Sequence, residues 1–479
     1  MISKSEQHKP LVIDLDGTLL KSDMLYECCI LFLRNNPLKF YRLFIWLFQG
    51  KAMLKKHLAE AVDIDVAVLP YDAKVLELIA TAKRSGHTIV LATATHISLA
   101  KEIANHLNIF DDVIASDETT NLSAHRKRDA LIARYGKKGF DYAGNSSEDI
   151  VVWQAASAAY VVNAPSNVLK KATEAGNIAE VITTNESTPK DYLKGLRIHQ
   201  WLKNILIFVP LLAGHELTNT PMLAQACIAF LCFGLCASSV YVLNDLLDLQ
   251  DDRHHSKKKN RAFASGKIPI KHGMFIFPTL LFISFILSIY WLSPEFIISL
   301  VIYYIITLMY SLYLKRQMTV DVITLAFLYT IRIIAGAAAM GLSLTFWLLT
   351  FSMFVFLSLA LVKRYAELND ARARGETEKT RGRGYYPADL EMISSLGGSA
   401  GYLSVMVLAL YIHDNATTSL YSHPQIIWLA CPILLYWITR MWMLTHRGQM
   451  HEDPVVFAAK DKISLIVGVL FGLVFWVAT

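Results

Sequence analysis

Charged residues are scarce in this chain. Only 18% of its 479 residues are Asp, Glu, Lys or Arg, while 54% are hydrophobic and the mean hydropathy is +0.37, a more apolar balance than a soluble globular protein usually has. Cysteine is rare as well. The six cysteines include no CxxC pair, which argues against a metal site, and we expect buried thiols in a reduced compartment. The length predicts at least two domains.

Long apolar runs are absent from the first part of the chain, up to about residue 190. The polar residues 1–10 contain no signal peptide, so we expect the N-terminus to stay in the cytosol. Short β-rich runs alternate with helical patterns such as 97–107, which predicts a parallel sheet with helices on both faces. The predicted strands are 11–15, 88–92, 141–143 and 159–162. The apolar helical insert at about 22–70 is interpreted as a cap over the active edge of the sheet, an ordinary subdomain, or one that rests on the bilayer surface.

Lysine and arginine are missing from alternate connections in the second part of the chain, between about residues 190 and 479. These connections join apolar segments whose lengths are near the roughly 20 residues that cross a bilayer. The nine segments are 199–213, 222–243, 273–292, 296–314, 319–341, 344–362, 397–413, 424–442 and 463–479. Connections on the other side are basic, with seven Lys or Arg residues in each of 244–272 and 363–396. The positive-inside rule therefore predicts a nine-helix inner-membrane protein with a cytosolic N-terminal domain and an outward C-terminus.

An acidic motif closes the second apolar segment, with Asn244, Asp245, Asp248 and Asp252 as its polar members. On a helix, positions 244, 248 and 252 share one face, and carboxylates at this density repel one another unless a cation is bound. Hard oxygen ligands favour Mg²⁺, which usually binds through one or two carboxylates plus substrate phosphates. The alternative, a solvated acidic helix end, would oppose the helix dipole. We therefore predict a Mg²⁺-diphosphate site.

Basic and polar residues lie at the same membrane level as this motif. Arg261 stands just before a turn of small residues, whereas the lysines that precede it fit ordinary positive-inside topology. Arg332 lies well inside the fifth segment, where an ionisable residue is costly and usually faces an interior cavity. The other candidate substrate-binding residues are Arg197, Lys203, Asn204, Tyr310, Lys315, Asp321, Lys363, Arg364 and Glu367.

These motifs resemble those of the UbiA-type membrane prenyltransferase superfamily, whose signature is an Asn-Asp-x-x-Asp-x-x-x-Asp motif after the second of nine helices. Within that superfamily the chain most resembles the decaprenyl-phosphate phosphoribosyltransferases, which make polyprenyl-phosphoryl phosphoribose for cell-envelope glycans. The resemblance rests on 196–204, 244–253, 310–315, 331–336 and 363–368. Two departures from the family pattern are Arg261-Ala262 in place of Arg-Pro, and a second acidic motif made of Glu367 and Asp370.

The resemblance implies a chemistry for the membrane part. Phosphoribosyl pyrophosphate would bind from the cytosol, with its diphosphate bridged by Mg²⁺ to Asp245, Asp248 and Asp252, and with Asn244 and Glu367 as further metal ligands. The phosphate of a polyprenyl phosphate would attack C1, which gains oxocarbenium character as in glycosyl transfer. The bases implied to offset charge on the leaving group are Lys203, Arg261 and Lys315.

The run Asp14-Leu-Asp16-Gly-Thr-Leu directly follows the first predicted strand and resembles the first motif of haloacid dehalogenase-type phosphatases. That resemblance implies that Asp14 is the nucleophile and Asp16 the general acid/base. Thr93 would bind phosphate, Lys127 would balance its charge, and Asn145 stands where the family usually has an acid. The implied metal ligands are Asp14, Asp149 and the main-chain carbonyl of Asp16.

The sequence therefore predicts a multidomain chain. Residues 1–185 would form an α/β haloacid dehalogenase-like domain with a helical cap, and 190–479 an all-α membrane domain. The fusion suggests that the first domain removes the 5-phosphate from the lipid made by the second. Two alternatives stay open, namely a prenyltransferase that moves an isoprenoid from its diphosphate to an aromatic or other acceptor, and a non-catalytic transporter or scaffold. No nucleic-acid partner is expected, and the oligomeric state stays open.

Overall fold

The computed structural model describes residues 8–118, 120–184, 187–255, 258–379, 383–412, 421–450 and 453–479. It separates into two compact units. The first comprises Met1–Leu196 and Tyr241–Phe277, and the second comprises Arg197–Val240 and Pro278–Thr479. The expected boundary at 185–190 divides the chain into two continuous stretches. The first unit of the structure is not continuous, because it also includes the helix ends around the acidic motif. That boundary therefore stays a prediction.

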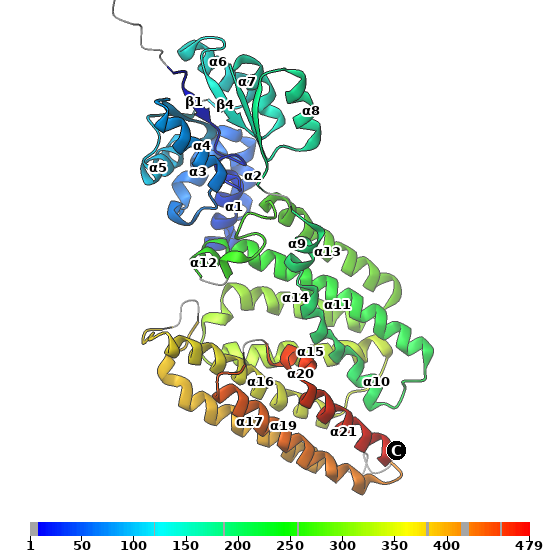
Figure 1. Cartoon of the computed structure of the whole chain (residues 1–479). Coiled ribbons are helices and arrows are strands. Elements are labelled where there is room, and N and C mark those ends of the chain that lie inside the picture. The colour runs from blue at the N-terminus through cyan, green and yellow to red at the C-terminus, as the bar shows by residue number, and fades with distance from the viewer. Residues whose placement is uncertain are drawn as a thin grey trace, which may run out of the picture. The chain divides into compact units, whose positions relative to one another are not determined.

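A six-stranded parallel sheet forms the centre of the first unit (Figure 1). Its strands are β1 (Leu11–Ile13), β2 (Ile89–His96), β3 (Asp112–Ser116), β4 (Asp141–Gly144), β5 (Ala159–Val162) and β6 (Ile178–Ile182). The order is β3-β2-β1-β4-β5-β6, and Leu11 in β1 pairs with Ile89 in β2 and Asp141 in β4. Because parallel strands end at one edge of the sheet, residues that follow β1, β2 and β4 meet there.

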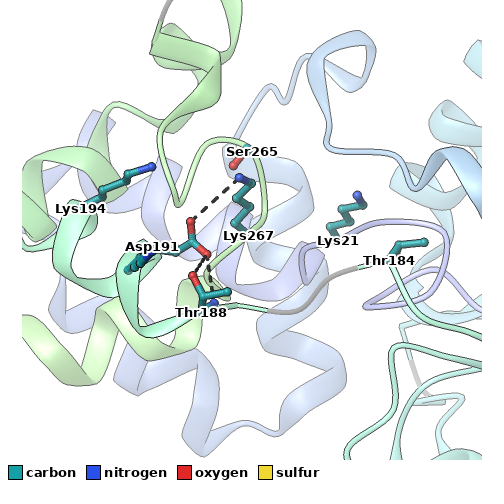
Figure 2. Close-up of a pocket in the computed structure, with 8 residues that line it drawn as sticks. Lys21, Thr184, Thr188, Asp191, Lys194, Ser265 and Lys267 are labelled. Carbon is teal, nitrogen blue, oxygen red and sulfur yellow. Dashed lines mark hydrogen bonds and ion pairs between the residues drawn. The ribbon is translucent and has the colours of Figure 1, made fainter.

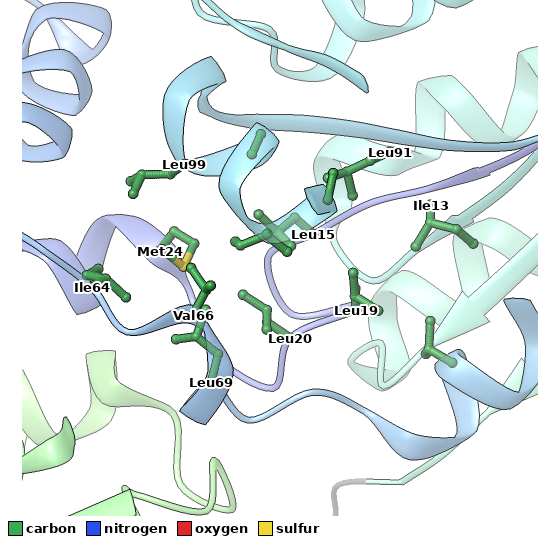
Figure 3. Close-up of a cluster of buried hydrophobic side chains, with 14 of the residues drawn as sticks. Ile13, Leu15, Leu19, Leu20, Met24, Ile64, Val66, Leu69, Leu91 and Leu99 are labelled. Carbon is green, nitrogen blue, oxygen red and sulfur yellow. The ribbon is translucent and has the colours of Figure 1, made fainter. Parts of the chain in front are cut away.

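Helices cover the sheet, and a helical cap is inserted after β1. The covering helices are α4 (Ala73–Arg84), α5 (Ile97–Leu107), α6 (Ala124–Tyr135), α7 (Ile150–Ala155) and α8 (Ser166–Glu174), and α9 (Pro189–Gly195) follows them. The cap helices are α1 (Met24–Asn35), α2 (Tyr41–Phe48) and α3 (Lys51–Ala61). Sheet and cap share one hydrophobic core, in which Ile13 and Leu91 of the strands lie in the same cluster as Met24 and Val66 of the insert (Figure 3). Burial of these side chains holds the cap on the sheet.

Seven helices of the described residues are long and apolar enough to cross a membrane. They are α11 (Thr220–Leu247), α13 (Ile270–Trp291), α14 (Pro294–Leu312), α15 (Val320–Met340), α16 (Phe346–Ala373), the helix Pro387–Ile412 that ends in α17, and the helix Pro424–His446 that ends in α19. The pair α20 (Pro454–Lys460) and α21 (Lys462–Ala478) is bent by 85° and makes up to eight if it counts as one span. The expected nine spans are not confirmed, because the first apolar segment forms only the shorter stretch Ile198–Ala213.

That shorter stretch consists of the 3-10 helix η4 (Ile198–Phe208) and α10 (Val209–Ala213). It lies directly against α15, where a Cβ on Gly336 would come within 2.1 Å of the Ile207 carbonyl oxygen. Only a residue without a side chain permits this approach. The contact brings the polar residues of η4 to the face of α15 that carries Arg332.

Candidate active sites

The predicted nucleophile Asp14 follows β1 and is held in a buried ion pair. Lys127, on α6, donates to Asp14 Oδ1 at 2.6 Å and to the Tyr142 hydroxyl at 3.0 Å, and its Nζ lies 3.8 Å from Asp149 Oδ1. Burial raises the pKa of Asp14 to about 7, although the Lys127 charge lowers it, and the carboxylates of Asp149 and Asp16 raise it further. The structure thus gathers the predicted nucleophile, lysine and last acid around one centre.

Both carboxylate oxygens of Asp16, the predicted acid/base, accept hydrogen bonds. The Met24 backbone N–H donates to Oδ1 at 2.8 Å, and the Thr95 hydroxyl donates to Oδ2 at 2.9 Å. The Thr95 N–H in turn donates to the Thr93 hydroxyl at 3.0 Å, so the predicted phosphate-binding residue is joined to Asp16 through Thr95. Sequence reasoning missed Thr95, yet its place two residues after Thr93 on a strand was a usable signal, because such residues share a face.

Asn145 packs against the turn that follows β1. Gly17 has a φ of +75°, and a Cβ there would lie 2.0 Å from Asn145 Nδ2. Asp149 Oδ2 accepts hydrogen bonds from the backbone N–H groups of Asn145 and Ser146 at 3.0 and 2.9 Å. Asp149 therefore caps the turn after β4 with one oxygen while its other oxygen faces Lys127. Its role as a metal ligand stays a prediction.

The acidic motif spans a break between two consecutive helices. Helix α11 ends at Leu247, and α12 (Leu249–His254) begins after Asp248. Backbone hydrogen bonds from Asp248 N to Asn244 O (2.9 Å) and from Asp252 N to Asp248 O (2.8 Å) carry the helical spacing across the break. The expectation of one continuous helix is wrong at Asp248, but the spacing of the motif is kept.

Arg261 lies between two carboxylates of this motif. Its Nη1 is 3.1 Å from Asp245 Oδ1 and 2.6 Å from Asp252 Oδ2. Burial raises the pKa of Asp252 to about 6, and the opposing charge of Arg261 does not fully compensate it. We had expected Arg261 to act on the leaving group, and the structure pairs it with the acids themselves.

The oxygen atoms of the motif fit a magnesium ion. Within the described part of the chain, the buried side-chain oxygen of Asn244 has no hydrogen-bond partner, and two neighbouring acids share one guanidinium. Hard oxygens of this kind suit Mg²⁺, which takes its remaining ligands from water and phosphate. Among the described residues, no group of three or more His, Cys, Asp or Glu residues is placed so that it could hold a metal ion by itself. Metal binding by Asp245, Asp248 and Asp252 therefore stays a prediction.

A buried ion pair joins the cap to the helix that carries the end of the motif. Arg253 donates to Glu27 Oε1 at 2.6 Å and to Oε2 at 3.1 Å, and its Nε donates to the Ala264 carbonyl at 2.9 Å. A second contact, Arg34 to Asp251 at 2.5 Å, lies on the same two helices. Sequence reasoning missed these pairs, because nothing in the local pattern indicates that residues more than 200 positions apart meet.

In the second unit, Asp453 binds two of the predicted bases. Lys203 Nζ lies 2.7 Å and Lys363 Nζ 3.3 Å from Asp453 Oδ2, and the Tyr329 hydroxyl donates to Oδ1 at 2.9 Å. Burial alone would raise the pKa of Asp453, but the charges of the two lysines outweigh it and lower that pKa well below its usual range. Asp453 was missed, although an Asp directly before Pro454 is a recognisable helix N-cap.

A second cluster of the same unit gathers around Arg364. This fully buried guanidinium pairs with Asp321 at 2.7 Å and with Glu367. The Tyr310 hydroxyl donates to Asp321 Oδ1 at 2.7 Å and accepts from Arg383 Nη1 at 3.1 Å. Four of the predicted residues therefore meet here, and Arg383 is an addition that the sequence did not single out.

Arg332, another of the predicted bases, is buried, and aromatic rings surround it. Its guanidinium carbon is 5.0 Å from the Tyr303 ring centroid and 5.3 Å from that of Phe233. Its Nε donates to Asn204 Oδ1 at 2.9 Å. The Asn204 side-chain nitrogen is buried without a hydrogen-bond partner among the residues the structure describes. A donor of this kind is available to a bound polar group.

Two predicted residues lie at or within 3-10 helices. Arg197 directly precedes η4 in the left-handed conformation, with a φ of 52°, and Lys315 lies in η6 (Leu314–Arg316). Their participation in binding stays a prediction.

A polar pocket of about 530 Å³ lies in the first unit (Figure 2). Its lining residues are Lys21, Thr184, Thr188, Lys190, Asp191, Lys194, Ser265 and Lys267. Four lysines thus face one carboxylate, which Lys267 approaches only to 4.0 Å. This excess of positive charge suits an anion.

Comparisons with known proteins match both halves. Residues 205–466 match the model of the UbiA prenyltransferase family, and residues 11–142 match that of haloacid dehalogenase-like hydrolases. An uncharacterized protein of Sinorhizobium fredii, y4nM, is 36% identical and aligns with 98% of this chain and 91% of its own length. Decaprenyl-phosphate phosphoribosyltransferase of Mycolicibacterium smegmatis is 28% identical and aligns with 61% of this chain and 95% of its own length.

Among solved structures, a UbiA homolog from Archaeoglobus fulgidus bound to GPP and Mg²⁺ covers 60% of this chain and 99% of its own, with 16% identity and a TM-score of 0.46. The seven or eight candidate spans among the described residues are those of a multi-pass membrane protein. Since a family model matches more than half of the residues, the chain belongs to the UbiA prenyltransferase family and carries a haloacid dehalogenase-like domain at its N-terminus.

Proposed function

We propose that the membrane half transfers 5-phosphoribose from phosphoribosyl pyrophosphate to a polyprenyl phosphate. The observation that carries the proposal is the buried ionic cluster of the second unit. Four cations from three segments meet three acids there, in one group around Asp453 and another around Arg364, and the adjacent α16 residues Lys363 and Arg364 belong one to each group. The cluster members are Lys203, Lys363, Arg364, Arg383, Asp321, Glu367 and Asp453.

Cations held in place by buried acids are suited to an anionic sugar, because they are oriented before the substrate arrives. The unpaired amide nitrogen of Asn204 adds a donor for a hydroxyl or phosphate oxygen. Ribosyl rather than prenyl transfer is supported by the similarity to a named phosphoribosyltransferase over nearly all of that protein's length.

In the proposed reaction the C1–O bond to pyrophosphate breaks, and pyrophosphate leaves with the bonding electrons. A phosphate oxygen of the polyprenyl phosphate forms the new bond to C1 from the opposite face, with no general base needed because that oxygen is already anionic. Asn244, Asp245, Asp248 and Asp252 would hold Mg²⁺, which when bound stabilises negative charge on the departing pyrophosphate.

We further propose that the first unit removes the 5-phosphate from the lipid product. An oxygen of Asp14 would attack phosphorus while Asp16 gives a proton to the departing ribose oxygen, and Asp16 would then activate the water that releases phosphate. Lys127, which already pairs with Asp14, would offset the charge of the transferred group. The lysine-lined pocket of the same unit supports an anionic substrate.

The transfer is tested with the purified full-length chain, Mg²⁺, polyprenyl phosphate and ribose-labelled phosphoribosyl pyrophosphate. Label should move into a lipid, and Asp245→Asn should lower the rate by at least about 10² because a charge-stabilising ligand is lost. Asp251→Asn is the matched control: this acid lies in the same motif but is partly exposed and pairs with the cap. A parallel mixture contains a prenyl diphosphate and an aromatic acceptor in place of these two substrates. Consumption of the prenyl diphosphate there, with no ribose label entering lipid in the first mixture, would show prenyl transfer.

The phosphatase step is tested in the same mixture with Asp14→Asn. The phosphorylated ribosyl lipid should then accumulate, whereas the wild-type chain should release inorganic phosphate from it. Asp129→Asn, an exposed acid on the helix that carries Lys127, serves as the control. An unchanged product profile in Asp14→Asn would separate the two activities.

A further inference from the structure

The cap of the first unit presents an unusually apolar outer surface, which we name the α2 patch. It consists of Leu38, Phe40, Tyr41, Phe44, Ile45, Leu47 and Phe48. Leu38 is 88% exposed and Phe48 is 92% exposed, so these side chains lie almost wholly outside the protein. In a soluble domain the outer face of such a helix is usually polar.

The inner face of α2 is apolar too, so the exposure of the patch is not the result of a misplaced helix. Leu43 and Trp46 pack against the core of the first unit, and the Trp46 ring lies 5.1 Å from those of Phe32 and His57. The helix is therefore anchored on one side while its other side carries apolar groups. A contiguous exposed surface of this kind marks a site of interaction.

Positive charge is interleaved with the patch, and negative charge is missing. The sequence has no Asp or Glu between Glu27 and Glu60. Three exposed cations, Lys39, Arg42 and Lys51, lie within or directly beside the patch. Aromatic and aliphatic side chains mixed with Lys and Arg are the composition of segments that lie in the interface of an anionic bilayer.

The same unit contains the ends of two membrane-spanning helices, and the cap is packed on them. Ile30 of α1 shares a buried cluster with Val242 and Leu246 of α11 and with Ile270 of α13. The helix that precedes the patch is thus fixed to the place where candidate spans end. A bilayer is therefore present beside the first unit in every copy of the protein, which distinguishes it from a protein partner that must be recruited.

We propose that the α2 patch inserts into the interface of the adjacent membrane leaflet and binds anionic lipid headgroups through Lys39, Arg42 and Lys51. Leu38, Phe44 and Phe48 enter the boundary between headgroups and acyl chains, at a depth of roughly 5–10 Å. This contact is independent of the chemistry proposed above. It would hold the cap at the membrane surface, where a lipid-linked substrate arrives.

The test uses the full chain in vesicles of phosphatidylcholine and phosphatidylglycerol. An environment-sensitive fluorophore is attached to a cysteine introduced as Leu38→Cys or Phe48→Cys, in a background where the exposed Cys227 is replaced by Ser. The control label is at Asp129→Cys, an exposed position on α6 outside the cap. Lipids brominated near the headgroup end of the acyl chain should quench both patch labels strongly and leave the control label nearly unchanged.

Two results would overturn the proposal. If brominated lipids do not quench the patch labels, the patch stays in water. Labels that instead quench one another as the protein density in the vesicle rises would show that a second copy covers the patch. The charged part is tested by replacing Lys39, Arg42 and Lys51 with Gln. Lipid quenching of the label at Phe48→Cys should fall in the triple variant, and it should also fall in the parent at high salt. Quenching that is unchanged under both conditions would refute the role of these cations.

Discussion

Replacing Glu27 by Leu should open the contact between the cap and α12. The Glu27 and Arg253 side chains are each only 4% exposed, so removing either partner leaves the other charge buried without its counter-ion. Such a loss typically costs about 3–5 kcal/mol. At about 1.4 kcal/mol for each factor of ten, the local opening equilibrium should rise by roughly 10²–10³ or more.

Removing both charges should cost far less. In the double variant Glu27→Leu with Arg253→Met, no buried charge is left, and exchanging a buried ion pair for apolar groups of similar volume is often neutral or stabilising. The remaining losses are two hydrogen bonds, from Arg253 Nε to the Ala264 carbonyl and from the Ser22 hydroxyl to Glu27, at about 1 kcal/mol each. The free-energy costs of the two single changes should therefore be strongly non-additive.

Hydrogen exchange of the detergent-solubilised full chain measures this directly, because protected amides report the free energy of local opening. Amides of α1 and of α12 should lose roughly 10²–10³ in protection in either single variant and recover most of it in the double variant. Amides of β4, in the same unit, serve as the internal control. Single variants within about threefold of the parent, or a double variant as unprotected as the weaker single, would refute the reasoning.

Three further predictions concern the second unit. Gly336→Ala should destabilise the chain by about 1–3 kcal/mol, measured by thermal unfolding in detergent, because the new Cβ would clash with the carbonyl of Ile207. The control Gly468→Ala should leave stability unchanged, because a Cβ at that position meets open space. Asp453→Asn should lower the stability of the protein most at neutral pH. Because the pKa of Asp453 is lowered on folding, its charge contributes stability at a pH above the ordinary value of 3.8, and this contribution is lost as the pH falls below that value. The stabilities of variant and parent, measured by thermal unfolding, should therefore converge in acid. Arg364→Lys should lower transfer by about 10² or more while leaving substrate-free folding detectable, since a lysine cannot make the forked contacts of a guanidinium. Equal activity of the lysine variant would contradict that role.

The central part of the soluble fold could be read from the sequence. The helix expected at 97–107 coincides with α5, and the four expected strands correspond to β1, β2, β4 and β5. The two strands that were missed, β3 and β6, are the edges of the sheet. An edge strand is covered on fewer sides, and β6 accordingly exposes Glu180 and Val181, so it lacks the continuous apolar run by which a central strand is recognised.

The membrane half followed its hydropathy pattern except at its two ends. The first segment is interrupted by a 3-10 conformation. The last, expected at 463–479, corresponds to α21, and a sharp bend at Asp461 joins it to α20, which was not expected. A window of apolar residues records composition but not a change of direction. Neither feature could therefore be predicted from the length of the apolar runs.

Within the sites, residues in local motifs were identified and their long-range partners were not. Asp14, Asp16 and Lys127 carry recognisable patterns, whereas Asp453 and Arg383 lie in connections whose charges also fit simple membrane topology. Their positions emerge only when distant segments meet. A single sequence holds the chemical groups of such a cluster but not the distances between them.

The first unit links its two acidic sites through one short helix. The backbone N–H at the start of α1, that of Met24, donates to Asp16, and one turn later Glu27 binds Arg253, the neighbour of Asp252. A helix turn is rigid on this scale, because each of its residues is tied to the next turn by a backbone hydrogen bond. A shift of α1 that released Asp16 would therefore also displace Arg253. Conversely, a shift of α12 that moved Arg253 would pull on Glu27 and so disturb the hydrogen bond to Asp16. This shared element gives the fusion of the two halves a physical consequence that two separate proteins would lack.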